Sequence, residues 1–148
     1  MIYTKLSKRL CAAFLTALVI AFFTIGAPAH AAPQKIAVAI NSEYDFDAGY
    51  PFPGTFTLSI DGVVVAAGTV TMEVASNQLG NRFHCLYRFT PTSGPAGTFI
   101  IREQCTFAPE PDRGRWEIVS GTGAYENVKG NGSALMPGNQ ENWVGFLY

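Results

Sequence analysis

The stretch from Gly114 to Ala134, GRWEIVSGTGAYENVKGNGSA, constrains the fold more than any other part of the chain. It begins with side chains that alternate around Trp116 and Ile118, which is typical of a pleated strand. The residues from Ser120 to Gly123 then interrupt the alternation, and glycines there permit the positive φ angles that tight turns use. The pattern predicts a strand, a tight turn and a second strand.

The second strand of this unit has one face of very small side chains. That face holds Val128, Gly130, Gly132 and Ala134, and the other holds Lys129, Asn131 and Ser133. In a closed sheet, the small face would leave room inside for a ligand. Large side chains elsewhere in the chain, such as Trp116, Phe56 and Phe89, could fill the same room. The sequence leaves both interpretations open.

The same stretch resembles the segment shared by plant dirigent proteins, allene oxide cyclases and small secreted bacterial proteins with the same barrel. The residues that carry the resemblance are Gly121, Thr122, Gly123, Ala124, Tyr125, Gly130 and Gly132, after Trp116. The resemblance implies an eight-stranded antiparallel barrel, in which this motif is structural. It implies no activity, because one fold hosts several functions, and none of the acidic cavity residues of those families can be transferred.

The rest of the chain agrees with an all-β fold. It is rich in Gly, Thr, Val, Phe and Tyr, and its alternating runs indicate about eight strands joined by short turns. Asp61-Gly62 is a two-residue hairpin signal that sets Leu58 opposite Val65, and a change of apolar phase at Gly68 predicts a β-bulge. We expect a closed antiparallel barrel of about eight strands, because closure removes exposed edges.

The first residues have the features of an export signal. Three basic residues precede an uncharged, mostly apolar run of 16 residues, Leu10 to Ile25, and Ala29-His30-Ala31 fits a cleavage site. A membrane anchor is the alternative, but a span needs about 20 residues. The sequence predicts a cleaved signal peptide over residues 1–31 and a single β-barrel domain over 32–148. The protein would then be secreted, extracellular or periplasmic, with no stable membrane span after cleavage.

The net charge of the expected domain argues against nucleic acid and anionic lipid as partners. Beyond Ala31 there are seven basic and eleven acidic residues, a formal charge of −4. We therefore expect no basic patch that would attract nucleic acid or anionic lipid.

Cys85 and Cys105 are the two cysteines of the expected domain. Two cysteines in an exported chain favour a disulfide, which would join the strands Arg82 to Thr90 and Thr98 to Phe107. If the cysteines face each other, Tyr87 lies opposite Glu103 and the hairpin is centred on Pro95. The closed loop would stabilise the fold by about 3 kcal/mol.

Several kinds of chemistry lack the residues they need. The domain has one histidine, His84, and no His/Cys cluster with metal-ligand spacing, so we expect no metal site and no cofactor. There is no G-x-S-x-G motif for a nucleophilic serine. Gly121-Thr122-Gly123 lacks the third glycine and the helix of a dinucleotide loop.

Acid–base chemistry is the best supported enzymatic option. Glu103 and Tyr87 project to one otherwise apolar face in the expected register, where burial would raise the pKa of a carboxyl. A solvated Glu103 at the barrel mouth is the alternative. The segment Ser42 to Pro53, expected to be a long loop after a strand that ends at Asn41, adds Tyr44 and Tyr50 as candidate ligand-binding residues. Trp116 is a further candidate.

These observations favour a secreted small β-barrel that binds or orients an apolar or aromatic small molecule without a defined catalytic centre. A structural or self-assembling protein is one alternative, because the expected last strand, Asn142 to Tyr148, is apolar on both faces and could form an oligomer contact after a turn at Met136 to Glu141. An isomerase or cyclase similar to allene oxide cyclase, acting through Glu103 and Tyr87, is the other.

Overall fold

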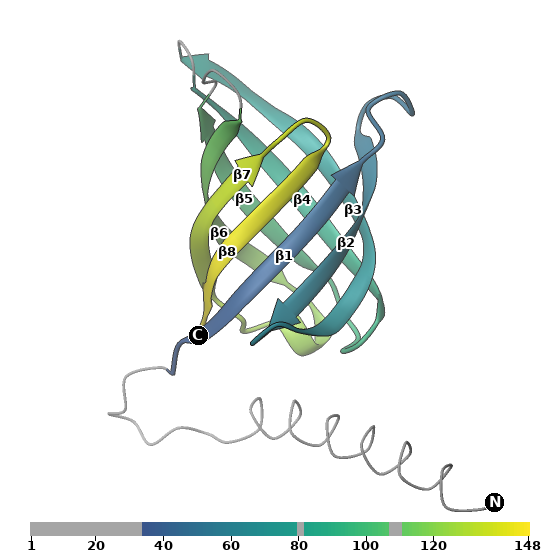
Figure 1. The fold of residues 1–148 in the computed structure, drawn as a ribbon, viewed down its shortest axis with the longest axis vertical. Coiled ribbons are helices and arrows are strands. Elements are labelled where there is room, and N and C mark those ends of the chain that lie inside the picture. Colours follow the sequence, from purple (N-terminus) through teal and green to yellow (C-terminus); the bar gives the residue numbers. More distant parts are fainter. Residues whose placement is uncertain (1–33, 80–81, 107–110) are drawn as a thin grey trace, which may run out of the picture. The chain divides into compact units, whose positions relative to one another are not determined.

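Eight antiparallel strands close into a barrel, in which every strand pairs with its neighbours in sequence and the last pairs with the first (Figure 1). The strands are β1 (Ile36–Tyr44), β2 (Phe52–Ile60), β3 (Val63–Leu79), β4 (Arg82–Ser93), β5 (Phe99–Thr106), β6 (Asp112–Gly121), β7 (Gly130–Met136) and β8 (Gln140–Leu147). This computed structural model describes residues 34–79, 82–106 and 111–148. The expected all-β, closed eight-stranded barrel is confirmed, and the predicted signal peptide lies outside the described residues.

Several strands extend further than the sequence pattern predicts. β2 begins at Phe52, inside the expected loop, and β4 continues to Ser93, beyond the expected Thr90. β1 continues to Tyr44 instead of ending at Asn41, because Ser42 and Tyr44 keep the inward phase of Val38 and Ile40 and are buried with them. β8 begins at Gln140, within the segment expected to be a turn. The extensions of β1 and β8 lie at the barrel end that carries the β1–β2 and β7–β8 connections, the upper end in Figure 1.

The β2–β3 hairpin turns at Asp61 and Gly62, as the sequence predicts. Both residues have positive φ, 49° and 78°, which a two-residue turn of this kind requires. Leu58 pairs with Ala66 and not with the expected Val65. The cause is a shift in the β2–β3 register between Ser59, which pairs with Val64, and Leu58. A second shift lies between Ala67 and Gly68, where β3 pairs with β4, so the predicted irregularity at Gly68 is present on that side.

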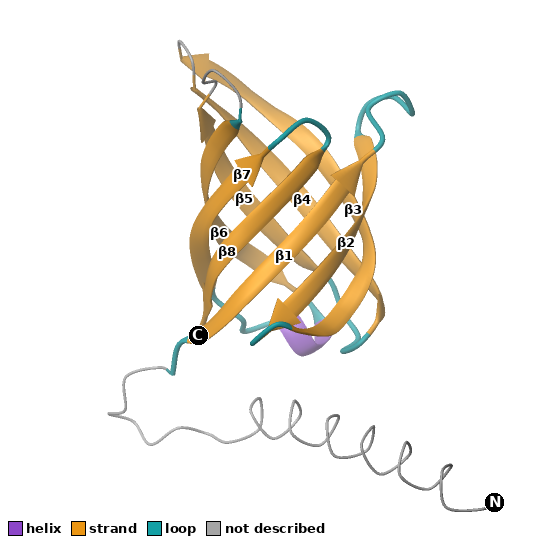
Figure 2. Cartoon of the chain, viewed as in Figure 1, coloured by secondary structure: helices purple, strands orange, loops and turns teal. Residues whose placement is uncertain are grey.

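The Gly-Thr-Gly turn closes the lower end of the barrel. It forms a short 3-10 helix, Gly123–Tyr125, drawn purple in Figure 2. Gly123 has φ +57°, and the Thr122 hydroxyl accepts a 3.0 Å hydrogen bond from the Thr98 amide of the β4–β5 connection. Tyr125 is buried with its ring centroid 5.0 Å from that of Phe99. The turn therefore docks one barrel connection against another and fills the opening between them.

The β4–β5 register differs from the expected one by two residues. Cys85 pairs with Glu103, and Cys105 pairs with Phe83, so the expected pairing of Cys85 with Cys105 is wrong. The hairpin is centred one residue earlier, at Gly94, whose φ of +90° suits a turn better than the restricted backbone of Pro95. Both cysteines are free thiols in the structure. The predicted disulfide stays a prediction.

Trp116 occupies the room above the small face of β7. Gly132 and Gly145 are paired across β7 and β8, and a Cβ on either would lie within 2.7 Å of the Trp116 ring. The indole Nε1 donates to the carbonyl oxygens of Ser133 and Val144, at 3.1 and 3.2 Å. Of the two interpretations left open by the sequence, the structure supports filling by an aromatic side chain.

Candidate functional site

Two glutamates meet inside the barrel. Glu103 from β5 is 2% exposed and Glu141 from β8 is 1% exposed. These strands are not neighbours in the sheet, so the two side chains approach one another across the interior. The carboxyls lie close enough for each to affect the pKa of the other. We call Glu103, Glu141, the two tyrosines that contact them, Tyr44 and Tyr87, and Ser42, the buried cross-strand neighbour of Glu141, the acid cluster.

Tyrosine hydroxyls supply the hydrogen bonds of the acid cluster. The Tyr44 hydroxyl donates to Glu141 Oε2 at 3.3 Å, and the Tyr87 hydroxyl lies 3.5 Å from Glu141 Oε1. Among the described residues, Glu103 Oε2 and the Ser42 hydroxyl have no hydrogen-bond partner, although both are buried. A buried oxygen without a partner costs free energy, so this end of the interior is incompletely satisfied.

Burial dominates the electrostatics of the acid cluster. It raises the pKa of Glu141 well above the ordinary value of 4.5, and the neighbouring Glu103 raises it further. Burial also raises the pKa of Glu103, against the effect of its hydrogen bonds. The pKa of Tyr44 and that of Tyr87 are raised by burial first and by Glu141 second. Each carboxyl of the pair therefore keeps its proton to a higher pH than an exposed glutamate does.

Gly114 provides the space in which the Glu103 side chain lies. A Cβ built on Gly114 would be 1.5 Å from Glu103 Oε1 and 2.4 Å from Glu103 Cδ. No residue with a side chain fits at position 114 unless the carboxyl moves. Gly114, the first residue of the stretch from Gly114 to Ala134, thus leaves the space that one of the two acids occupies.

The two thiols adjoin the acid cluster. Cys85 and Cys105 are buried on β4 and β5, close enough for each thiol to shift the pKa of the other. Their proximity lowers the pKa of Cys85 and raises the pKa of Cys105, which also lies against Glu103. The pair is diagonal and not directly opposite, which in antiparallel sheets corresponds to about 7–8 Å between Cα atoms.

A continuous row of aromatic rings runs from the surface to the acid cluster. Tyr50, which is 62% exposed, contacts Phe52 with ring centroids 5.6 Å apart. Phe52 contacts Phe46 at 5.2 Å, and Phe46 stacks on Tyr44 at 6.0 Å. Tyr44 then lies 6.1 Å from Tyr87, inside the barrel. The β1–β2 connection thus carries a path of aromatic surface to the buried carboxyls.

The structure brings together three of the residues selected from the sequence, Glu103, Tyr87 and Tyr44. It places Tyr50 at the outer end of the aromatic row. Trp116 lies above the glycines of β7 and β8 and is paired with Glu103 across β5 and β6. The sequence reasoning missed Glu141. Extending the alternation of Trp143 and Gly145 by one step would have put Glu141 on the inner face.

No group of three or more His, Cys, Asp or Glu side chains suited to a metal ion occurs in the part of the chain that the structure describes. Within that same part, no helix is long and apolar enough to cross a membrane.

Comparison with known proteins identifies a family and no further relative. Residues 53–148, well over half of the chain, match the model of a family described as protein of unknown function (DUF3224). The match runs from β2 to β8 and includes Glu103, Glu141 and the stretch from Gly114 to Ala134. No curated protein matches the chain. No solved structure matches it either.

Proposed function

This chain belongs to the DUF3224 family, and we propose that it is a secreted barrel that binds a small aromatic or apolar molecule at the acid cluster. The ligand has an aromatic or apolar body and one group that donates a hydrogen bond, a hydroxyl or an amine. Its body lies along the aromatic row of the β1–β2 connection, and its donor reaches Glu103 and Glu141. The similarity to dirigent proteins and allene oxide cyclases is part of this proposal.

The observation that carries the proposal is the unpartnered Oε2 atom of Glu103. Two carboxyls are buried together, and the ion pair between Arg102 and Glu117 is on the outer surface. Burying acids without a cation costs several kcal/mol, roughly, for each ionised group. Proteins retain destabilising buried acids mainly at functional sites. A ligand that donates a hydrogen bond to Glu103 would remove part of the free-energy cost.

Four benzene derivatives test the proposal because they differ in one group. Benzylamine and benzyl alcohol carry a donor, toluene carries none, and phenylacetate carries an anion. Binding is followed by tryptophan fluorescence, because Trp143 lies 4.6 Å from Tyr87, centroid to centroid. We expect benzylamine and benzyl alcohol to bind more tightly than toluene, and phenylacetate to be excluded by the two acids.

Matched variants separate the site from general effects of charge. Glu103→Gln should abolish the preference for benzylamine over toluene, whereas Glu126→Gln, an exposed acid beyond the 3-10 turn, should leave it unchanged. Phenylacetate binding as tightly as benzylamine would overturn the proposal. Mass spectrometry of the natively purified protein then identifies the natural ligand by its co-purified mass.

An isomerase or cyclase is the second candidate, and the burial of Glu103 and Glu141 side by side, which raises the pKa of both carboxyls, favours it. A protonated carboxyl beside an ionised one can donate a proton to a substrate and take another back. The test is turnover of an epoxide of an unsaturated fatty acid, the substrate type that the allene oxide cyclase resemblance implies. Unchanged turnover in both Glu103→Gln and Glu141→Gln would exclude this mechanism.

Self-assembly is the third candidate, carried by the outer face of β8. Val144, Phe146 and Tyr148 are 54%, 46% and 42% exposed, which is an unusual row of apolar side chains for a surface strand. A second copy of the chain could cover this face. Light scattering at high concentration should then report a dimer that Phe146→Ser converts to monomer. A monomer in both proteins would exclude the candidate.

A further inference from the structure

The outer face of the barrel carries a regular array of mostly polar side chains over β4 to β8, together with the apolar Leu135 and Val144. One row across the strands is Arg82, Thr106, Arg113, Leu135 and Asn142. The next row is His84, Gln104, Arg115, Ser133 and Val144. Because side chains alternate between the two faces of a strand, both rows point away from the acid cluster.

Every arginine of the described residues lies on three consecutive strands. Arg82 and Arg88 are on β4, Arg102 is on β5, and Arg113 and Arg115 are on β6. Arg102 forms an ion pair with Glu117. Within the described chain, no ion pair or side-chain hydrogen bond involves Arg82, Arg113 or Arg115. The expectation that no basic patch remains, drawn from a formal charge of −4, therefore does not hold for this face.

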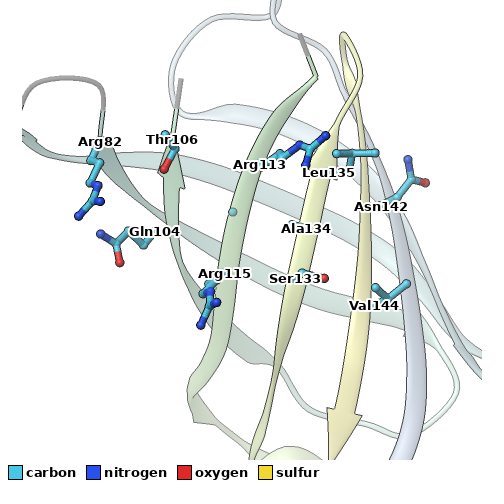
Figure 3. Close-up of a pocket in the computed structure, with 11 residues that line it drawn as sticks. Arg82, Gln104, Thr106, Arg113, Arg115, Ser133, Ala134, Leu135, Asn142 and Val144 are labelled. Carbon is cyan, nitrogen blue, oxygen red and sulfur yellow. The ribbon is translucent and has the colours of Figure 1, made fainter. Parts of the chain in front are cut away.

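The three unpaired arginines border a hollow of about 660 Å³. Figure 3 shows Arg82 on one side and Arg113 and Arg115 on β6, with Gln104 and Thr106 of β5 between them. A smaller hollow of about 410 Å³ adjoins it and shares Gln104 and Arg115. Together, the two hollows make a groove, here called the arginine groove, that follows β5 and β6 along the barrel.

We propose that the arginine groove binds a ligand with two or more oxyanion groups, phosphate or sulfate. Strand geometry places Arg113 and Arg115 about 7 Å apart along β6, and Arg82 about 10 Å from Arg113 across two strands. The guanidinium groups therefore cannot all reach one anion without leaving their strands, but they can each take a separate group of a short oligoanion.

The neutral residues of the groove complete the recognition. Gln104 and Thr106 lie between the arginines and can donate hydrogen bonds to the oxygen atoms that the guanidinium groups leave free. Ser133 and Asn142 offer hydroxyl and amide groups on the far side, suited to a sugar or polyol that carries the anions. This mixture of fixed cations and neutral donors distinguishes the groove from a purely electrostatic patch.

Calorimetry with three probes tests the proposal on the whole folded protein at low ionic strength. Tripolyphosphate presents several phosphates, sucrose octasulfate presents sulfates on a sugar, and orthophosphate presents one group. We expect either oligoanion to bind at least about tenfold more tightly than orthophosphate, because each additional charged contact contributes about a factor of ten or more. Binding of tripolyphosphate alone would specify phosphate, and binding of both would extend the site to sulfate esters.

Matched arginine variants localise the binding. Arg115→Gln and Arg82→Gln should each weaken oligoanion binding about tenfold. Arg88→Gln removes an equally exposed arginine of β4 that does not line either hollow and should leave binding within about twofold. Equal losses in Arg88→Gln and Arg115→Gln, or no preference for oligoanions over orthophosphate, would overturn the proposal. Circular dichroism establishes that each variant retains its β-sheet spectrum.

Discussion

The two ends of the barrel interior are built on opposite principles. At the lower end, Phe89 stacks on Phe99 with centroids 4.6 Å apart and meets Phe56 edge-on at 5.0 Å. At the upper end, Glu103 and Glu141 are equally buried, but Glu103 Oε2 has no hydrogen-bond partner among the described residues. The lower end gains free energy from burial and ring contacts, whereas the upper end loses it.

The contrast separates a layer of packed aromatic rings from a layer of incompletely satisfied acids. A small barrel needs one well-packed layer to remain closed, and the Phe56, Phe89 and Phe99 contacts supply it. With that layer in place, the other end can hold acids that a stability argument would replace with apolar residues. Four perturbations test the contrast, beginning with the aromatic end.

Phe89→Ala should have the largest effect, a loss of about 3–5 kcal/mol in the free energy of unfolding. Phe89 is fully buried and contacts Phe56, Phe99 and Trp143. Urea denaturation measures the loss, with exposed Val144→Ala as the control. A cost below about 1 kcal/mol would mean that the aromatic end does not hold the barrel together.

Oxidation of Cys85 and Cys105 should have the next largest effect. For protein recovered from an oxidising compartment, we expect a disulfide and a gain below the about 3 kcal/mol of an unstrained loop, because a diagonal pair about 7–8 Å apart must shift its backbone to come within the about 7 Å that a disulfide bridges. Alkylation before and after reduction, read by mass spectrometry, measures the thiols. Full alkylation of unfolded, unreduced protein would show that the pair stays reduced.

Gly114→Ala should destabilise the acid end by about 1–3 kcal/mol, because the new Cβ overlaps the Glu103 carboxyl. The cost should largely disappear in a Glu103→Ala background, which a double-mutant cycle measures. Gly132→Ala is the matched control, since its Cβ would lie 2.0 Å from the backbone oxygen of Val144. If Glu103→Ala rescued both glycine variants equally, the contact between Gly114 and Glu103 would not be the cause.

The smallest effect is a dependence of stability on pH. The pKa of Glu141 is raised in the folded state, so its contribution is fully present below pH 4.5 and is lost as pH rises through the folded pKa. The loss is at most about 1.4 kcal/mol per pH unit for one carboxyl. Urea midpoints measured upward from pH 4.5 should fall in the natural protein and flatten in Glu141→Gln. Parallel curves for the two proteins would contradict the assignment.

Short sequence patterns predict local structure well where the residues strongly favour one backbone conformation. Asp61-Gly62 specifies a turn with two positive φ angles, and the turn is there. The Gly-Thr-Gly turn with Tyr125 lies between β6 and β7 as expected. The expected pairing of Leu58 with Val65 in β2–β3 and the register of β4–β5 were wrong, because a small change in or beside a turn alters the pairings along the hairpin while each strand keeps its own alternation.

The candidate site was only partly within reach of the sequence. Glu103 and Tyr87 were identified because both interrupt or flank an apolar face, and Tyr44 because it lies in an aromatic-rich segment. Glu141 was missed because polar residues next to Pro137 and Gly138 are typical of a turn. The sequence analysis missed the arginine groove because the net charge of the chain does not show where in the fold the charged side chains lie.

The sequence by itself determined the all-β class, the approximate number of strands and the turn that closes the lower end, because alternation and glycine placement act over a few neighbouring residues. Only the tertiary structure decided that β5 and β8 bring two acids together across the interior, that Trp116 fills the small face of β7, and that arginines from β4 and β6 border one groove. Those contacts depend on barrel closure and on strand register, which are set by packing between residues far apart in the chain.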